Sequence, residues 1–333
     1  MLERWSRREF MHGGGLVAAS GLLGGWVDQS VAEPSLETTR LRTAHGAVMC
    51  EAPQSLAEEF FAAEGFTDVK YVETQNVDKA LAAGEIDIAM RFSAPLIGLI
   101  DEGLPVVFLS GVHVGCIDLF VREDIRSVRE LKGQRLATDK AIAGTDLFFA
   151  SILAHVGIDP RRDVRWVDAP LLEWPALLAN GKVDAFLSWP PHSLEVREKK
   201  IGRVLLTTAS DRPWSQYFCC MVAARREFVE KHPVATKRAL RAVLKATDIC
   251  AREPERVARW IVGRAYTKRL DLAERMLRTL PYAKWREYEP EDTVRYYALR
   301  LHESGLIKSS PRKIIDRATN WRFLRELKRE MKA

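Results

Sequence analysis

Between residues 40 and 208, short apolar runs of strand type alternate with segments whose apolar positions recur at helical spacing. This alternation is typical of sheets with crossover helices, so the sequence predicts an α/β protein with mostly parallel strands. The expected strands are 41–44, 69–72, 86–90, 106–110, 119–122, 135–138, 165–167, 185–188 and 204–206.

Helical segments lie between these strands, and several end before a glycine, which favours the left-handed backbone at a helix end. After Met221 the strand-type runs stop and helical patterns follow one another, several with proline near the start. The expected helices are 53–64, 77–83, 171–180, 227–231, 233–252, 254–264, 270–279 and 290–304. The sequence therefore predicts an α/β part completed by a helical C-terminal part.

The first 32 residues have the composition of an export signal. Ser6, Arg7 and Arg8 precede an uncharged, glycine-rich stretch at 13–27, and small residues follow at Ser30 and Ala32. This pattern predicts a twin-arginine signal peptide cleaved after Ala32, a periplasmic mature protein and the twin-arginine translocase as a partner during export. A membrane anchor is the alternative, but the stretch is shorter than the roughly 20 apolar residues that a spanning helix needs.

Charge and cysteine content narrow the functional classes. The formal net charge is +6, but basic residues of the C-terminal third alternate with acidic ones, as on solvated helix faces, so nucleic acid is not an expected partner. The five cysteines lack metal-binding spacing and are expected to be buried free thiols, with a disulfide between Cys219 and Cys220 as the alternative. No metal and no cofactor are expected.

Several motifs occur in an order typical of one family. They are 81–89 (LAAGEIDIA) followed by Ser93 and Pro95, 103–107 (GLPVV), 128–137 (VRELKGQRLA), 177–186 (LLANGKVDAF), and 232–233 (HP) before a long helix. In this order they resemble the solute-binding proteins of nitrate, sulfonate and taurine ABC importers, a family that includes binders of thiamine pyrimidine precursors.

The resemblance implies a monomeric receptor with the two-lobed periplasmic-binding-protein fold. One lobe would comprise 33–120 completed by 221–333, and the other 121–220, with hinges near Val121 and Cys220. Ligand would bind between the lobes, where loops follow the carboxyl ends of strands, and closure would signal to the membrane permease.

These loops supply the candidate ligand-binding residues His45, Gly46, Arg91, Phe92, Ser93, His113, Lys140, Thr145, Trp189 and Tyr217. Arg91 is expected to bind a carboxylate or sulfonate, or else to form a salt bridge. Ser93 matches the family's serine at a helix start and could bind an acidic oxygen or simply cap the helix. Trp189 and Tyr217 could stack on a planar ligand or fill the core.

His45 and His113 are expected to be polar wall residues, with a metal site formed by the two as a minor alternative. Where sulfonate-binding relatives usually carry hydroxyl residues, this chain has apolar Ala141, Ile142 and Ala143. The expected ligand is therefore a small organic anion with an apolar or aromatic body.

The function expected is the solute-binding component of an ABC importer. A binder of a thiamine pyrimidine precursor is the alternative. A further possibility is an enzyme, because a eukaryotic branch of the wider family makes that pyrimidine with a cysteine-rich motif near the equivalent of 217–220. No common catalytic motif is present in the sequence, so a non-enzyme is expected.

Overall fold

The computed structural model describes residues 33–45, 49–74, 76–140 and 144–331, and Ser35–Ala333 form one compact unit. The expected signal peptide, Gly46 and residues 141–143 lie outside the described residues. Among the described helices, none has the length and apolar character needed to cross a membrane.

The first lobe is built on two small sheets. Strand β1 (Arg40–Thr43) pairs in parallel with β2 (Asp68–Tyr71). Strand β10 (Phe218–Arg225) lies between β3 (Ile88–Phe92) and β4 (Val106–Val114) and is antiparallel to both. All of β4 and all of β10 except its last residue are buried, so these strands form the centre of the lobe.

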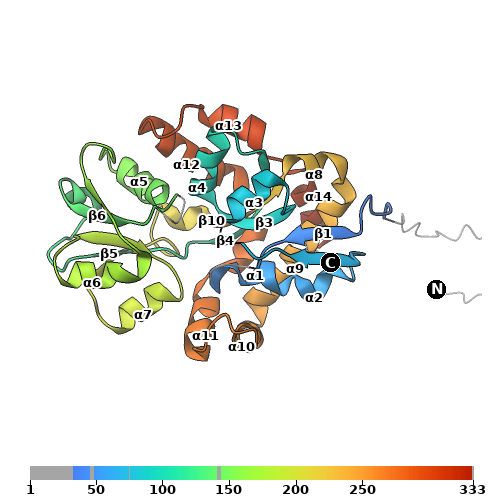
Figure 1. Ribbon diagram of the computed structural model, residues 1–333, viewed down its shortest axis with the longest axis horizontal. Helices are drawn as coiled ribbons and strands as arrows, with labels where there is room; N and C mark the ends of the chain where they lie inside the picture. The colour runs from blue at the N-terminus through green and yellow to red at the C-terminus, as the bar shows by residue number, and fades with distance from the viewer. Residues whose placement is uncertain (1–32, 46–48, 75, 141–143, 332–333) are drawn as a thin grey trace, which may run out of the picture. The chain divides into compact units, whose positions relative to one another are not determined.

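The second lobe contains a 5-stranded sheet in the order β7-β6-β8-β5-β9. Strand β6 is parallel to β7 and β8, whereas β5 is antiparallel to β8 and β9. The strands are β5 (Asp118–Val121), β6 (Arg135–Thr138), β7 (Arg165–Asp168), β8 (Ala185–Ser188) and β9 (Arg203–Thr207). Figure 1 shows this sheet in green beside the first lobe, and β4 leads directly into β5 while β9 leads into β10.

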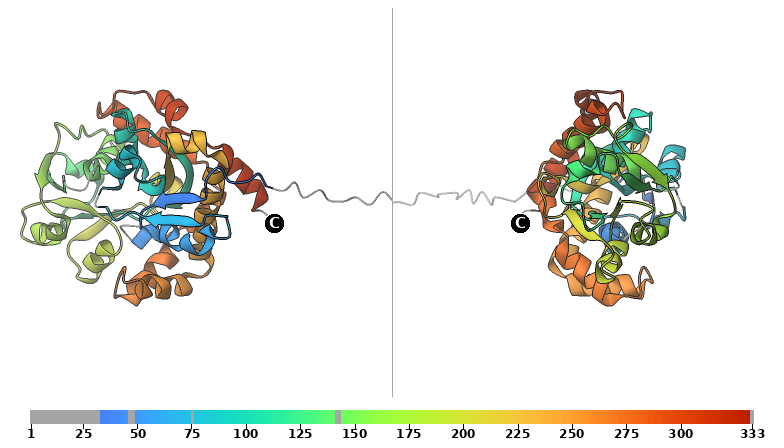
Figure 2. Two further views of the ribbon diagram at one scale, coloured as in Figure 1. Left: turned by 45° about the vertical axis from the view of Figure 1, so that its right-hand side comes forward. Right: turned by 90° about the vertical axis from the view of Figure 1, so that its left-hand side faces the viewer.

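Helices cover both lobes. Those before β10 are α1 (Ala52–Leu56), α2 (Glu58–Phe61), α3 (Val77–Ala83), α4 (Ser93–Asp101), α5 (Thr145–His155), α6 (Trp174–Ala179) and α7 (His192–Glu198). Those after β10 are α8 (Arg226–Lys231), α9 (Pro233–Arg252), α10 (Pro254–Gly263), α11 (Leu270–Thr279), α12 (Pro290–Glu303), α13 (Pro311–Ala318) and α14 (Arg322–Glu330). Figure 2 shows that the later helices, in orange and red, gather around the first lobe.

The α/β fold class is confirmed, and every expected strand is present within a few residues of its expected bounds. The sheets are more mixed than expected, because β5 and β10 each run antiparallel to their neighbours. The helix expected at 53–64 is divided into α1 and α2, and the one at 171–180 begins with a 3-10 turn at Leu171–Glu173. Helices α7, α13 and α14 were not predicted.

The two glycine–aspartate motifs form matching structures, one in each lobe. Gly84 (φ 73°) ends α3 and Gly181 (φ 62°) follows α6, and each leads through a short turn to a buried aspartate. Asp87 accepts hydrogen bonds from the backbone N–H of Arg42 and from its guanidinium, at 2.6–3.1 Å. Asp184 accepts the equivalent bonds from Arg135, at 2.7–2.9 Å. Each motif thus joins a strand to its neighbour by a charged clamp.

Asp184→Ala should lower the free energy of unfolding by about 1.5–3 kcal/mol, because it removes hydrogen bonds to a charged acceptor that is 2% exposed. The measurement is urea denaturation at pH 7. The matched control is Asp124→Ala, because Asp124 is 70% exposed and pairs with Arg122, which also bonds Asp184. It should change stability by less than about 0.5 kcal/mol. Equal losses in both variants would contradict the clamp.

The effect of Asp184 should also depend on pH. Burial alone would raise the pKa of Asp184, but hydrogen bonds from Arg135 and the charge of Arg122 lower it below the usual range. The stabilisation is therefore complete above the unfolded-state pKa of about 3.9 and is lost as pH falls through the folded-state pKa. The difference between the parent and Asp184→Ala should be constant from pH 7 to pH 5 and should shrink below about pH 4.

Candidate functional site

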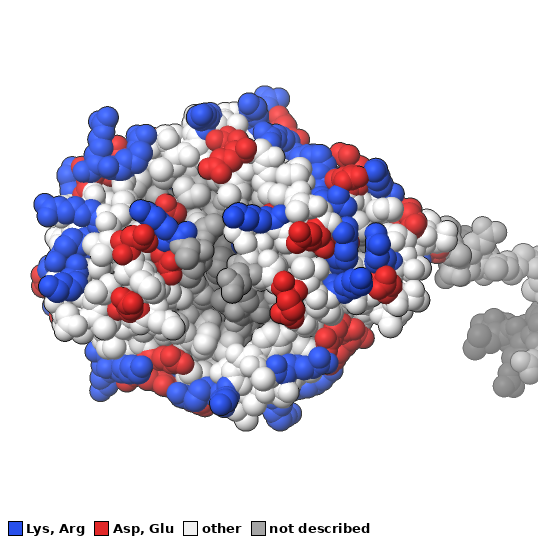
Figure 3. Space-filling view, viewed as in Figure 1, with Lys and Arg blue, Asp and Glu red and all other residues white. Residues whose placement is uncertain are grey.

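Loops from the two lobes meet where the sequence predicted a binding cleft. Phe92, at the end of β3, contacts Trp189, which follows β8, with ring centroids 5.8 Å apart in an edge-to-face arrangement. Nearby, Gly144 packs so tightly on Pro95 of α4 that a Cβ at Gly144 would lie 2.3 Å from the proline ring. Figure 3 shows this face of the molecule hollowed between the two lobes, with positive and negative side chains interspersed around the hollow.

Two helices begin at this meeting point. Helix α4 starts directly after Phe92 in the first lobe, and α5 starts directly after Gly144 in the second. The first backbone N–H groups of a helix lack partners within it, and the helix dipole adds partial positive charge there. The arrangement can therefore attract an anion without a charged side chain.

Arg91 forms the salt bridge that was one of its two expected roles. Its Nε and Nη2 donate to the two carboxylate oxygens of Asp78 on α3, at 2.7 and 2.5 Å. The Arg91 side chain is 18% exposed and that of Asp78 is 10% exposed. Burial alone would lower the pKa of Arg91, but the charge and hydrogen bonds of Asp78 raise it. The Nε and Nη2 groups of Arg91 are therefore already used in hydrogen bonds to Asp78 within the first lobe.

Ser93 is fully buried, and its hydroxyl donates a 2.8 Å hydrogen bond to the carbonyl oxygen of Phe218. The residue at the N-cap position of α4 is Phe92, so Ser93 does not cap the helix in the expected way. Its hydroxyl hydrogen instead joins α4 to β10. Any contact of Ser93 with an anion would therefore use its backbone rather than this hydrogen.

Two other candidate residues take part in aromatic packing within the first lobe and its helices. The ring of His45 stacks on Tyr71, with centroids 4.2 Å apart, and its Nδ1 lies 2.9 Å from the hydroxyl of Tyr266. Tyr217 stacks on Tyr296 of α12, with centroids 4.0 Å apart. Tyr217 therefore packs against another side chain of the protein, which was the alternative to stacking on a planar ligand.

The remaining candidates in the second lobe differ in exposure. Trp189 is 7% exposed and faces Phe92, as described above. The Lys140 side chain is 79% exposed, with its Nζ 3.8 Å from Asp168. Thr145 is the first residue of α5. The structure thus brings Phe92, Ser93, Trp189 and the start of α5 together, whereas the side chains of Arg91 and Tyr217 contact Asp78 and Tyr296.

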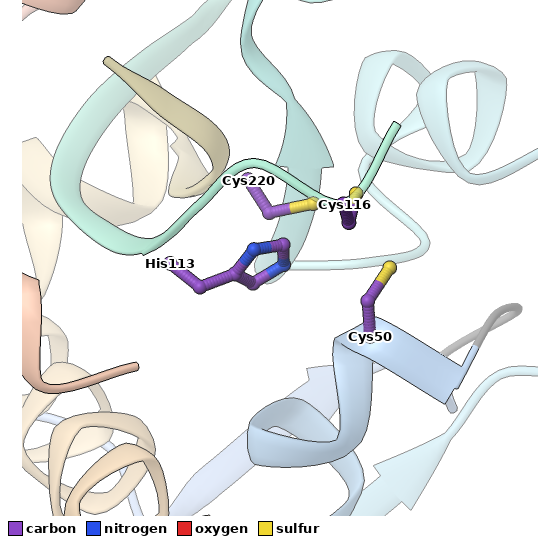
Figure 4. Close-up of side chains that lie close together, drawn as sticks. All are labelled: Cys50, His113, Cys116 and Cys220. Carbon is purple, nitrogen blue, oxygen red and sulfur yellow. The ribbon is translucent and has the colours of Figure 1, made fainter. Parts of the chain in front are cut away.

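The expectation that His113 is a wall residue is wrong. His113 is fully buried on β4, where it lies opposite Cys220 of the central strand β10. It lies in a cluster with Cys50, Cys116 and Cys220, whose potential ligand atoms all lie within 4.8 Å of one another. Figure 4 shows these side chains around a common space. Sequence spacing gave no signal for this cluster, because its members are separated by up to 170 positions.

All five cysteines are buried and free, as expected, and Cys219 and Cys220 are not joined. The Sγ of Cys219 lies 3.1 Å from that of Cys116, beside the four-residue cluster. Burial alone would raise the pKa of Cys219, but hydrogen bonds with Cys116 and Cys220 lower it to about 7. In contrast, burial raises the pKa of Cys250, which lies apart on α9.

Two α/β lobes, connected by the β4–β5 and β9–β10 crossings and meeting at loops beyond strand ends, define a two-lobed periplasmic-binding-protein fold. The chain belongs to the NMT1-like family, whose model matches residues 35–262.

Among curated relatives, the taurine-binding periplasmic protein of Escherichia coli strain K12 is 27% identical over 218 residues, which are 61% of this chain and 66% of the relative. The nitrate/nitrite-binding protein of Nostoc sp. strain PCC 7120 is 26% identical over 285 residues, with 76% and 64% covered. The chain thus spans slightly less than two thirds of the length of these relatives.

A solved structure, the periplasmic nitrate-binding protein of Synechocystis PCC 6803, superimposes with a TM-score of 0.69. It is 18% identical, and 90% of each chain is covered. At this identity the similarity establishes the fold.

Because Arg91 and Asp78 are direct partners, we expect replacement of either residue to have the same effect on stability. Arg91→Ala and Asp78→Ala should each lower the free energy of unfolding by about 1.5–3 kcal/mol, because each removes a bidentate charged hydrogen bond. The double variant should lose clearly less than the sum, because the two residues are direct partners. Denaturant unfolding of the four proteins checks this. Additive losses, or a stable Arg91→Ala protein that has lost only ligand binding, would contradict the assignment.

Proposed function

We propose that this protein is the extracytoplasmic solute-binding component of an ABC importer, and that it captures a small organic anion between its lobes. The observation that carries the proposal is the meeting of Phe92 and the start of α4 with Trp189 and the start of α5. The names of the taurine-binding and nitrate/nitrite-binding relatives support a small anion as the ligand, and taurine is an organic one. No enzymatic step is part of the proposal.

Anion binding at this place would depend on backbone groups. Because Arg91 is paired with Asp78, the charge of the ligand would be met by the N-terminal N–H groups of α4 and α5. Phe92 and Trp189 offer aromatic surface from opposite lobes, which suits a planar or apolar ligand body. A ligand held by both lobes would favour the closed arrangement, which a membrane permease could then recognise.

A neutral ligand of the pyrimidine-precursor type is the second candidate. The specific observation in its favour is that the guanidinium of Arg91 is already neutralised by Asp78, so it offers no free counter-ion to an acid. Aromatic stacking on Phe92 and Trp189 would serve such a ligand equally well. The two candidates therefore differ in charge rather than in shape.

A thermal-shift screen of residues 33–333 should separate the candidates. The probes are taurine, longer alkanesulfonates, nitrate, bicarbonate, aromatic carboxylates and neutral aminopyrimidines. A ligand present at 100 times its Kd adds about 2.7 kcal/mol of stability, which gives a measurable rise in Tm. We expect an organic acid to give the largest rise. A rise with aminopyrimidines alone would favour the second candidate, and catalytic turnover of any probe would contradict both.

Trp189→Ala should weaken binding of the ligand so found by about three- to ten-fold in calorimetry. The reason is that an aromatic contact contributes about 0.5–1.5 kcal/mol beyond its buried area, and 1.4 kcal/mol is tenfold in affinity. Trp321→Ala is the matched control, because Trp321 lies at the start of α14, among the C-terminal helices of the first lobe. Its affinity should be unchanged. Equal weakening by both variants would place the ligand elsewhere.

The proposed location is the periplasm, reached through a cleaved twin-arginine signal, with the mature protein acting as a monomer. Changing Arg7 and Arg8 together to Lys should leave an uncleaved precursor in the cytoplasm, because the paired arginines are the address that the translocase recognises. Cell fractionation with detection of the C-terminus checks this, and the unaltered chain is the control. Normal export of the double variant would contradict the proposed route.

A further inference from the structure

The cysteine–histidine cluster is assembled from four separate parts of the chain. Cys50 lies in the 3-10 turn Met49–Glu51 after β1, His113 lies near the end of β4, and Cys116 lies in the link from β4 to β5. Cys220 lies on β10 directly opposite His113 in the strand register. The cluster therefore sits where the two connections between the lobes pass each other. All four residues are at most 5% exposed.

The hydrogen bonding of His113 leaves one nitrogen of its imidazole available as a metal ligand. Its Nδ1 lies 2.8 Å from the carbonyl oxygen of Gly115, and because a carbonyl can only accept, Nδ1 must carry the hydrogen. In the neutral ring the lone pair is then on Nε2, which is buried and has no hydrogen-bond partner among the described residues. Metal-bound histidines usually have this arrangement, with one ring nitrogen on a backbone carbonyl and the other on the metal.

A second layer of contacts holds the other members in place. The hydroxyl of Tyr282 donates to the carbonyl oxygen of Cys50, at 3.0 Å, and its ring packs edge-to-face on His113. The backbone N–H of Cys116 donates to the hydroxyl of Thr208, at 3.2 Å. These contacts fix both the turn and the link between the lobes, so the cluster is preorganised rather than a chance meeting of buried thiols.

We propose that Cys50, Cys116 and Cys220 through Sγ, and His113 through Nε2, bind one thiophilic metal ion of the zinc class. A tetrahedral site with metal–sulfur bonds of about 2.3 Å has its sulfur atoms about 3.8 Å apart, so a single ion requires only a small contraction of the 4.8 Å cluster. Thiolate and imidazole ligands together select zinc or copper(I) over magnesium or calcium.

Four protein ligands with no exposed position are typical of a structural site rather than a catalytic one. The ion would join the turn after β1 to the end of β4, to the link between β4 and β5 and to the start of β10, and would thereby stiffen the hinge. Cys116 also lines a cavity of about 310 Å³ between α7 and α11. The proposal does not depend on the identity of the transported solute.

The test is metal content and cobalt spectroscopy of the full mature chain, residues 33–333. Purified protein should retain about one zinc or copper ion per chain in mass spectrometry of the elements after extensive dialysis. Reloading with Co²⁺ should give the visible bands of a tetrahedral ion and the near-ultraviolet charge-transfer band of cobalt–thiolate bonds. Cys220→Ser and His113→Gln should each lower metal retention at least ten-fold, with circular dichroism used to confirm folding.

Two matched controls use thiols outside the proposed ligand set. Cys250→Ser removes a buried thiol on α9, and Cys219→Ser removes the thiol beside Cys116. Both variants should retain metal like the parent. If a ligand variant does not fold, the cobalt spectrum of the parent still tests the site, because a spectrum without thiolate bands would overturn it. A metal-free parent after reconstitution, loss of metal in Cys219→Ser, or a Cys116–Cys219 disulfide in peptide mapping would also overturn the proposal.

Discussion

The arrangement of strand β10 is the constraint on which most of this structure depends. The chain returns from the second lobe once, at Phe218–Arg225, and is inserted between β3 and β4 with nearly every residue buried. This insertion determines that β10 runs antiparallel to both neighbours. It also brings Phe218 to Ser93 at the start of α4 and Cys220 to His113 on β4. The hinge, the start of the candidate ligand site and the cysteine–histidine cluster therefore share one strand.

The buried aspartate–arginine pairs of this molecule lie within the lobes rather than between them. Asp87, Asp184 and Asp78 each hold an arginine by bidentate hydrogen bonds, and each of these pairs joins elements of one lobe. Buried carboxylates need such partners, because an unpaired buried charge is strongly unfavourable. Where Phe92 meets Trp189, the groups that come together are helix N-termini and aromatic rings, whereas Arg269 and Glu198 form an ion pair between the lobes at a separate place, beside α7 and α11. Recognition of an anion at the first of these places would depend on preorganised backbone dipoles.

Much of the fold could be predicted because its strands and helices follow from local patterns in the sequence. Apolar runs of strand length located β1 to β9, Gly84 marked the end of α3, and helical periodicity located α9 and α11. Helices α13 and α14 were missed because they are short and rich in charge, and only packing against the first lobe makes them stable. For the candidate site, sequence order located the loops around Phe92 and Trp189 but could not show that Arg91 forms a salt bridge with Asp78.

The sequence by itself determined the α/β class, the family resemblance and the burial of the cysteines, because these follow from residue type, from local spacing and from the order of short motifs along the chain. Tertiary structure alone decided which strands are antiparallel, which arginines are already paired, and that Cys50, His113, Cys116 and Cys220 share one site. The physical reason is that these features join segments far apart in the chain. Their contacts depend on how the two lobes exchange strands, which no local pattern of residues records.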